Sequence, residues 1–382
     1  MATTETTSTS WFSRIGNSIK GVFFGILLLI GAPILLFWNE KRTVDTTVAL
    51  QEGKSATVAA DAAVVDPKNE GKLVHISGMA STSQKLSDEL AGVSVSALRL
   101  KRTVEVYQWS EHQSSQTKDK IGGGQETTTT YTYEKKWSDR LIDSTSFKES
   151  EAHVNPTEKT VESSEWTVSD ATVGAFSLSP SLLGMLSGFT SVPLPPQTET
   201  LIPGAQSQRK IVGNMLYLHT MDPAVPVVGD TRVSYSAITP QELSIIALQR
   251  GATFEGYKTK NGQTIQMIEL GNHTIDEMFT NAQSSNMVMA WILRAVGTLL
   301  IFIGFNLTLG VLPAIAMVLP FLGRFIGGGM ALMAFFLTVI VASITIAIAW
   351  FAARPLLSLG LLVVIVVAVV LLMKRGKPAK AK

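Results

Sequence analysis

The chain has 382 residues, of which 46% are hydrophobic and 16% are charged, and its formal net charge is only +2. This balanced charge argues against nucleic-acid binding, which normally requires a basic face or stripe. The complete absence of cysteine excludes disulfides, thiolate metal ligands and cysteine nucleophiles. These averages conceal a division of the chain into apolar ends and a polar middle.

The N-terminal region is expected to hold a disordered segment followed by a membrane anchor. Residues 1–20 are interpreted as a disordered N-terminus, because their first part is rich in Thr and Ser. The apolar stretch 21–38 is longer than the apolar region of a cleavable signal peptide, and it ends without a small-x-small cleavage site. It therefore predicts an uncleaved membrane-spanning helix, with Trp38 at the interface.

The polar middle, residues 39–287, is long enough for one large domain or two small ones. Segments rich in β-forming residues dominate it. Two of them, 98–109 and 126–137, flank the glycines 122–124, a pattern typical of a long hairpin with a flexible tip. Four prolines within 191–203 mark a candidate internal boundary.

The C-terminal part of the chain is predicted to contain three more membrane-spanning helices. A capping box at Thr274 and Glu277 predicts the start of a helix that leads towards the first of them. A bilayer core of about 30 Å needs roughly 20 apolar residues per span. On that basis the spans are placed at 289–312, 327–351 and 356–373.

The predicted fold is a multi-pass α-helical membrane protein with four spans. A large β-rich α+β extramembrane domain, residues 39–287, lies between spans 1 and 2. The tail 374–382 is basic and carries no acid, so the positive-inside rule places it in the cytoplasm. With four spans the N-terminus is cytoplasmic as well. The domain is then extracytoplasmic, which means periplasmic in a bacterium or lumenal in a eukaryote.

The sequence contains no recognisable catalytic or metal-binding motif. None of the five histidines has a metal-ligand spacing, and neither a nucleophile elbow nor a phosphate-binding P-loop occurs. We therefore expect no cofactor, no metal site and no enzymatic activity.

Polar residues in or beside the spans are functional candidates by default, because they are costly in a membrane. Arg294 lies about six residues into the second span, and its alternative role is to extend towards the lipid headgroups. Asn306 lies deeper in that span and is expected to help pack helices together. Arg354 lies between the last two spans. No Asp or Glu falls within any predicted span, which argues against a transporter or a pump.

Several short segments, in order along the chain, resemble the transmembrane protein 43 (LUMA) family. They are 69–76 (NEGKLVHI), 104–109 (VEVYQW), His153-x-Asn155-Pro156, 228–234 (VGDTRVS), 249–251 (QRG), Trp291-x-x-Arg294-Ala295-x-Gly297 and Arg354-Pro355. The resemblance adds His153, Asn155, Asp230 and Arg232 as candidate functional residues. For Asp230 and Arg232 the alternative is a turn residue and a surface ion pair.

The resemblance implies four spans and one large lumenal or extracytoplasmic domain. Eukaryotic members of the family reside in the endoplasmic reticulum and the inner nuclear membrane. They associate with emerin and lamins, help to organise the nuclear envelope and are not known as enzymes. Because this chain lacks cysteine and is rich in Ala, Thr and Ser, we expect a bacterial member in the cell membrane. The nuclear partners would then not carry over.

Two functions are consistent with the sequence. The first is a non-enzymatic membrane-organising scaffold that contacts membrane lipids, binds other membrane proteins and forms homo-oligomers, without nucleic acid. The alternative is a lipid-binding or lipid-handling membrane-stress protein. For this alternative, the apolar, proline-flanked segment 178–194 would form a lobe that contacts lipid. The two hypotheses differ in whether the isolated domain carries bound lipid.

Overall fold

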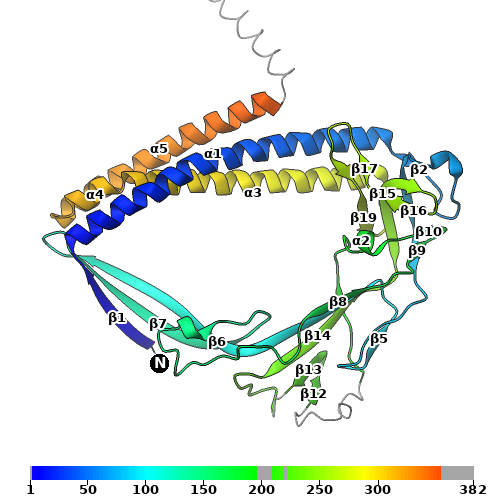
Figure 1. Ribbon diagram of the computed structural model, residues 1–382, viewed down its shortest axis with the longest axis horizontal. Helices are drawn as coiled ribbons and strands as arrows, with labels where there is room; N and C mark the ends of the chain where they lie inside the picture. Colours follow the sequence, from blue (N-terminus) through cyan, green and yellow to red (C-terminus); the bar gives the residue numbers. More distant parts are fainter. Residues whose placement is uncertain (1, 196–208, 219–221, 354–382) are drawn as a thin grey trace, which may run out of the picture. The chain divides into compact units, whose positions relative to one another are not determined.

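The structure is a computed structural model that describes residues 2–195, 209–218 and 222–353 (Figure 1). The chain forms two compact units. The first, here called the β unit, comprises Met1–Thr6, Glu52–Gln116 and Thr128–Thr280. The second, the helical unit, comprises Thr7–Gln51, Thr117–Thr127 and Asn281–Lys382. The boundary therefore falls within two long helices and within one long hairpin.

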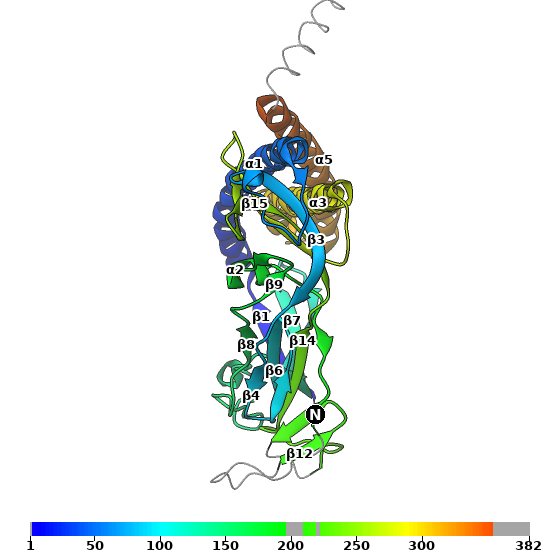
Figure 2. The ribbon, with the colours of Figure 1, turned by 90° about the vertical axis from the view of Figure 1, so that its right-hand side faces the viewer.

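The first large sheet has the strand order β1-β7-β6-β14-β13-β12, with β8 paired to β6 and β11 paired to β14. The pairs that β14 makes with β6, β11 and β13 are antiparallel, as are β12–β13 and β6–β8. Its strands are β1 (Ala2–Thr9), β6 (Arg99–Asp119), β7 (Gln125–Ser138), β8 (Ser164–Thr167), β11 (Thr190–Ser191), β12 (Arg209–Val212), β13 (Met215–Leu218) and β14 (Thr231–Ile238). Figure 2 shows β6, β7 and β14 side by side.

The second large sheet has the order β10-β9-β3-β15-β16, with β19 paired to β15 and β2 paired to β3. Its strands are β2 (Val58–Ala59), β3 (Leu73–Ser81), β9 (Thr172–Val173), β10 (Phe176–Ser177), β15 (Glu242–Arg250), β16 (Thr253–Glu255) and β19 (Met267–Leu270). Two small strand pairs and three short helical turns complete the β unit. They are β4 (Leu86–Asp88) with β5 (Val93–Val95), β17 (Tyr257–Lys258) with β18 (Thr264–Ile265), η1 (Pro67–Asn69), η2 (Ser144–Ser146) and α2 (Pro180–Leu183).

The core of the β unit explains the apolar segment 178–194. Leu178, Leu182 and Leu183 are buried against the inner residues of β3 and β15, and Leu194 is buried in a second cluster under β14. Burying such side chains stabilises the fold by about 1.5–3 kcal/mol each relative to exposing them. The lipid-contacting lobe expected from the sequence is therefore absent, because its leucines form the core instead.

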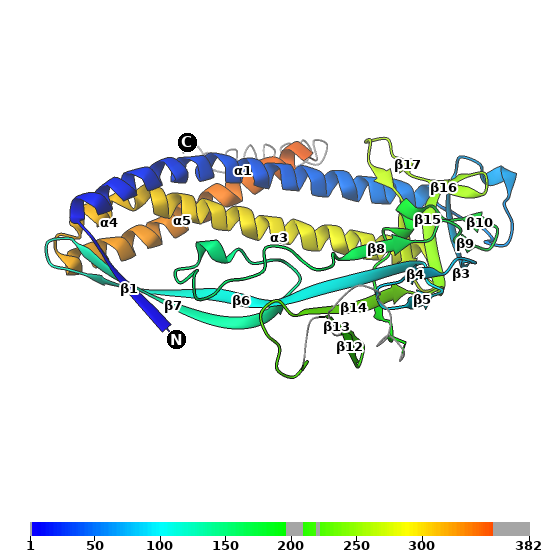
Figure 3. The same ribbon diagram turned by 60° about the horizontal axis from the view of Figure 1, so that its bottom comes forward.

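The helical unit consists of α1 (Trp11–Ala56), α3 (Ile275–Leu309), α4 (Val311–Ala316) and α5 (Pro320–Ala353). Figure 3 shows α1, α3 and α5 running alongside one another. Among the described residues, three helical stretches are long and apolar enough to cross a membrane, and they contain the predicted spans 21–38, 289–312 and 327–351. The fourth predicted span, 356–373, lies outside the described residues, as do Arg354 and the tail 374–382.

The N-terminal segment differs from the expected disordered 1–20. Residues Ala2–Thr9 form β1 beside β7, and α1 starts at Trp11, ten residues before the predicted span. Threonine is a good strand former, and the backbone N–H of Ser13 donates to the Ser10 side chain (3.2 Å), which caps the helix. Strand pairing and a cap, rather than apolar content, order this segment.

Candidate functional site

Polar side chains line one face of α1 and the facing side of α3 in the helical unit. On α1 they are Glu40 with Asn39, Thr43 and Thr47, whose spacing of four residues keeps them on one face. On α3 they are Gln283, Asn286 and Arg294. We call this set the polar seam. Its members contact one another across the two helices, as the distances below show.

The strongest contact in the polar seam is a bidentate ion pair between Arg294 and Glu40. Arg294 Nε donates to Glu40 Oε1 (2.5 Å) and Nη2 donates to Oε2 (2.8 Å). The Glu40 side chain is only 2% exposed. The guanidinium also lies over the Trp291 ring, 4.9 Å from its centroid. Paired hydrogen bonds between charged groups are among the strongest in proteins, so this contact orients both helices.

Sequence reasoning missed Glu40 because the residue follows the end of the predicted span 21–38. The helix α1 continues to Ala56, so Glu40 lies within it. The feature that identifies Glu40 as the partner of Arg294 is the antiparallel alignment of α1 and α3. The alignment that brings Gly25 to Gly304 also brings Leu36 to Gly297 and Glu40 to Arg294. Arg294 therefore pairs with an acid on α1.

Three amide side chains extend the polar seam. The Asn39 amide donates to the Ala290 carbonyl (3.0 Å), the Asn286 amide to the Thr43 carbonyl (3.0 Å), and the Gln283 amide to Thr47 Oγ1 (3.1 Å). Asn39 and Asn286 are buried, and their Oδ1 atoms have no partner within the described part of the chain. Such oxygens commonly bind ordered water.

Glycine allows α1 and α3 to approach closely at the other end of their contact. A Cβ placed on Gly25 would lie 2.7 Å from the Gly304 carbonyl oxygen and 2.5 Å from Thr308 Oγ1. The absence of a side chain at Gly25 and Gly304 therefore permits this close approach. The Asn306 amide donates to the Phe302 carbonyl of its own helix (2.8 Å), and its role in helix packing stays a prediction.

A cavity of about 500 Å³ lies between α3 and α5. One wall is the face of α3 from Trp291 to Phe302, and the other is the face of α5 from Phe335 to Ile346. Arg294 is the charged residue in its lining.

The tip of the β6–β7 hairpin, which the sequence predicts, belongs to the helical unit. Asp119 accepts from Arg14 (3.1 Å) and from Arg324 (3.1 Å), and the Gly122 N–H donates to the Val318 carbonyl (3.0 Å). Gly122 and the next glycine have positive φ values of 89° and 82°, which only glycine adopts readily. The predicted topology, with the N-terminus inside and the domain outside, does not account for the Asp119–Arg14 contact.

The candidate residues of the β unit hold its loops together. His153 stacks on Tyr133, with ring centroids 3.7 Å apart, and packs edge-on against Trp109 at 4.6 Å. Asn155 is buried. Its Oδ1 accepts from the Trp109 N–H (2.7 Å), and its Nδ2 donates to the carbonyls of Trp109 (2.9 Å) and Ile142 (3.1 Å). The three hydrogen bonds fix β6 to two loops.

Asp230 and Arg232 flank the start of β14. Asp230 Oδ2 accepts from the Val227 N–H (2.8 Å) and closes a turn. Arg232 makes a bidentate pair with Glu105, its cross-strand neighbour on β6 (2.7 and 3.0 Å), and lies over Trp137. The alternative interpretation, a turn residue and an ion pair on the sheet, describes these contacts.

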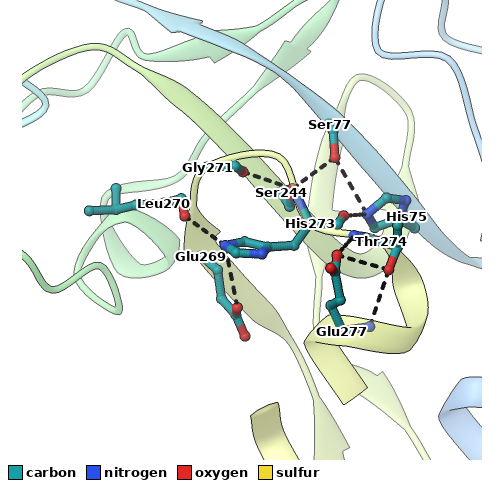
Figure 4. Close-up of polar contacts among 9 residues, drawn as sticks. All are labelled: His75, Ser77, Ser244, Glu269, Leu270, Gly271, His273, Thr274 and Glu277. Carbon is teal, nitrogen blue, oxygen red and sulfur yellow. Dashed lines mark hydrogen bonds and ion pairs between the residues drawn. The ribbon is translucent and has the colours of Figure 1, made fainter. Parts of the chain in front are cut away.

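The start of α3 confirms the predicted capping box (Figure 4). The Glu277 N–H donates to Thr274 Oγ1 (3.2 Å), and the Thr274 N–H donates to Glu277 Oε2 (2.7 Å). The preceding residue is also held, because the His273 N–H donates to Ser244 Oγ on β15 (2.7 Å) and the His273 carbonyl faces His75 Nε2 on β3 (2.8 Å).

Ser77 lies beside His75 in Figure 4, with Ser77 Oγ 3.4 Å from His75 Nε2. The hydrogen bonds rule out an activated serine. Ser244 donates to the Gly271 carbonyl (2.9 Å), so the Ser77 hydroxyl must donate to Ser244 (2.8 Å). His75 Nε2 faces a carbonyl and therefore carries a proton, so it cannot act as a base towards Ser77. Burial also lowers the pKa of His75. No group of metal-binding side chains occurs among the described residues either.

With this geometry in place, similarity to known proteins identifies the family. The family model described as Transmembrane protein 43 matches residues 106–355. The chain is 32% identical to human Transmembrane protein 43 over 383 residues, covering 97% of this chain and 93% of that protein. The chain belongs to the transmembrane protein 43 family. No solved structure matches it.

Other members of the transmembrane protein 43 family align almost as fully. The mouse protein is 32% identical over 91% of this chain and 88% of its own length, and the Drosophila melanogaster homolog is 26% identical over 89% and 90%. The family match covers Arg294, Asn155 and Asp230 but not Glu40. The partner of Arg294 therefore comes from a helix outside the matched region.

Proposed function

We propose that this member of the transmembrane protein 43 family is a non-enzymatic membrane-organising scaffold. The observation that supports it is the use made of the candidate side chains. His153, Asn155, Asp230 and Arg232 all serve internal packing, turns or strand pairing. Function would then reside in the surfaces of the β unit and of the spans, through which the protein binds other membrane proteins and associates with itself.

A surface pocket of the β unit is the proposed docking point for a protein partner. Its volume is about 320 Å³, and Asn155, Pro156 and Val154 form part of its lining. Val154 is 63% exposed, whereas Asn155 is held rigidly by three hydrogen bonds. A rigid pocket with an exposed apolar rim suits one large apolar side chain, and such anchors supply much of the energy of an interface.

The proposal is tested by crosslinking the full-length protein in its native membrane and comparing the recovered proteins. Val154→Glu places a charge at the pocket, whereas Val225→Glu does the same on an exposed loop that does not line it. Loss of a defined set of partners from Val154→Glu alone is the expected result. Identical partner sets from both variants would exclude the pocket as the docking point. Turnover of a substrate by the purified protein would contradict the non-enzymatic scaffold function itself.

One observation favours the lipid-handling alternative, but it does not concern the segment 178–194, from which the sequence predicted a lipid-contacting lobe. The leucines of the segment 178–194 are buried in the core and are not available to contact lipid. The cavity between α3 and α5 instead has an apolar wall and one cation.

A further inference from the structure

The cavity between α3 and α5 has the size and lining of a ligand site. Its volume of about 500 Å³ lies within the range of roughly 300–1,000 Å³ typical of such sites. Leu299 and Phe302 of α3 face Phe335 and Val339 of α5. Thr298 and Thr338 also line it, and the Thr338 hydroxyl donates to the Ala334 carbonyl of its own helix (2.7 Å). Apart from these hydroxyls, the facing walls are mainly apolar.

Arg294, the charged residue of the lining, has one hydrogen-bonding nitrogen that its ion pair with Glu40 does not use. Arg294 uses Nε and Nη2 for Glu40, and no described residue accepts a hydrogen bond from its Nη1. Because the Glu40 carboxylate and the Trp291 ring hold the guanidinium in place, its remaining donor is oriented in advance. A planar guanidinium readily bridges a carboxylate and a phosphate oxygen.

Together these features select the chemistry of the occupant. An apolar wall alone would accept any hydrocarbon, and a lone arginine would accept any anion. A wall that ends in a guanidinium with one unused donor suits a molecule with a long apolar chain and a phosphate head, which the guanidinium can contact while it stays paired with Glu40. Arg294 lies five residues from the start of the predicted span at 289, or roughly 8 Å along the helix, close to the level at which tryptophan marks an interface.

We propose that this cavity binds one acyl chain of a membrane phospholipid, with the phosphate contacting Arg294 Nη1. The site goes beyond the scaffold function and does not depend on the partner pocket of the β unit. Bound lipid would fill the space between α3 and α5 and tie their packing to the state of the polar seam.

The test uses a phosphatidylglycerol analogue with a diazirine on one acyl chain, incorporated in phosphatidylcholine vesicles that contain the full-length protein. After irradiation, mass spectrometry locates the crosslinks. Val339→Trp fills the cavity, whereas Ile340→Trp places the same bulk on a neighbouring exposed position that does not line it. We expect Val339→Trp to reduce crosslinks at 295–302 and 335–346 by about tenfold, equivalent to about 1.4 kcal/mol, and Ile340→Trp to leave them unchanged.

A diacylglycerol analogue with the same acyl chain but no phosphate distinguishes the contribution of the headgroup to binding from that of the chain. The wild-type protein should prefer the phosphatidylglycerol analogue, and the double variant Glu40→Gln/Arg294→Gln should lose that preference while still crosslinking both. Equal crosslinking of Val339→Trp and Ile340→Trp would mean that the probe marks only lipid around the protein, and the proposal fails. It also fails if engineered cysteines at Leu299 and Val363 form a disulfide, because segment 356–373 then fills the cavity.

Discussion

The two units of the molecule each contain a bidentate arginine–glutamate pair, and the two pairs differ in their surroundings. In the β unit, Arg232 and Glu105 lie on the sheet with about a quarter of each side chain exposed. In the helical unit, Glu40 is almost fully buried between apolar helices. Water can replace the partner of either charge in the first pair but not of Glu40 in the second. Removal of one partner should therefore cost little on the sheet and much more between the helices.

The first prediction concerns the helical unit, and it has only two outcomes: the hairpin tip and the N-terminal end of α1 lie on the same side of the membrane or on opposite sides. The Asp119–Arg14 contact and the β1–β7 pairing require the hairpin tip and the N-terminal end of α1 to lie on one side of the membrane, because a polar hairpin does not cross hydrocarbon. In this cysteine-free chain, Ile121→Cys and Ser13→Cys should both react with an impermeant maleimide from the same side.

Labelling of the two cysteines from opposite sides would uphold the four-span topology predicted from the sequence. It would also show that Asp119 and Arg14 do not meet in the membrane. Ile121 is the better position at the tip, because it is 90% exposed, whereas a side chain at Gly123 would collide with Trp11.

The second prediction separates the two ion pairs by stability. Arg294→Gln leaves the Glu40 carboxylate, whose side chain is 2% exposed, without its cation, and breaking a buried pair in this way costs about 3–5 kcal/mol. Arg232→Gln leaves Glu105 in contact with water, and a surface pair contributes about 0.2–1 kcal/mol. Thermal unfolding of the full-length protein in detergent should show a large loss of Tm only for Arg294→Gln.

The double variant Glu40→Gln/Arg294→Gln is the control for this prediction. It removes both charges and should recover much of the lost stability, since two neutral amides can bond each other. Equal Tm changes for Arg294→Gln and Arg232→Gln would contradict the distinction between the units.

A smaller effect is expected where the two helices touch through glycine. Gly25→Leu puts carbon atoms where the Gly304 carbonyl and Thr308 lie, and overpacking of this kind costs about 1–3 kcal/mol. Gly31→Leu is the matched control, because a Cβ there meets nothing within 4 Å. The measurement is the Tm of each variant in detergent, and an unchanged Gly25→Leu protein would show that α1 and α3 are further apart.

The contrast between the units also explains which features the sequence predicts. The hairpin glycines and the Thr274–Glu277 capping box are local signals, since turn and cap residues act within a few positions. The apolar helices follow from length and composition. The Arg294–Glu40 pair depends on the alignment of helices about 250 residues apart along the chain. The strand at Ala2–Thr9 depends on pairing with β7 and shows no apolar alternation. The ion pair has no local signal, and the strand has only the β-propensity of its threonines.

The smallest expected effect lies in the β unit, at the start of α3. Burial lowers the pKa of His75 below its ordinary value of about 6.5, so the folded protein keeps this ring neutral where the unfolded chain binds a proton. Between the lowered pKa and about 6.5 the unfolded state holds more protons, and stability therefore falls as the pH falls through this window. Below the lowered pKa both states are protonated and the loss is complete.

Urea unfolding of the full-length protein in detergent at a series of pH values measures this loss. His75→Gln can still donate to the His273 carbonyl but cannot titrate, so it should flatten the decline between neutral and mildly acidic pH. His112→Gln changes an exposed ring on the sheet and should leave the decline in place. If the decline survives in His75→Gln, protonation at the start of α3 is not its cause.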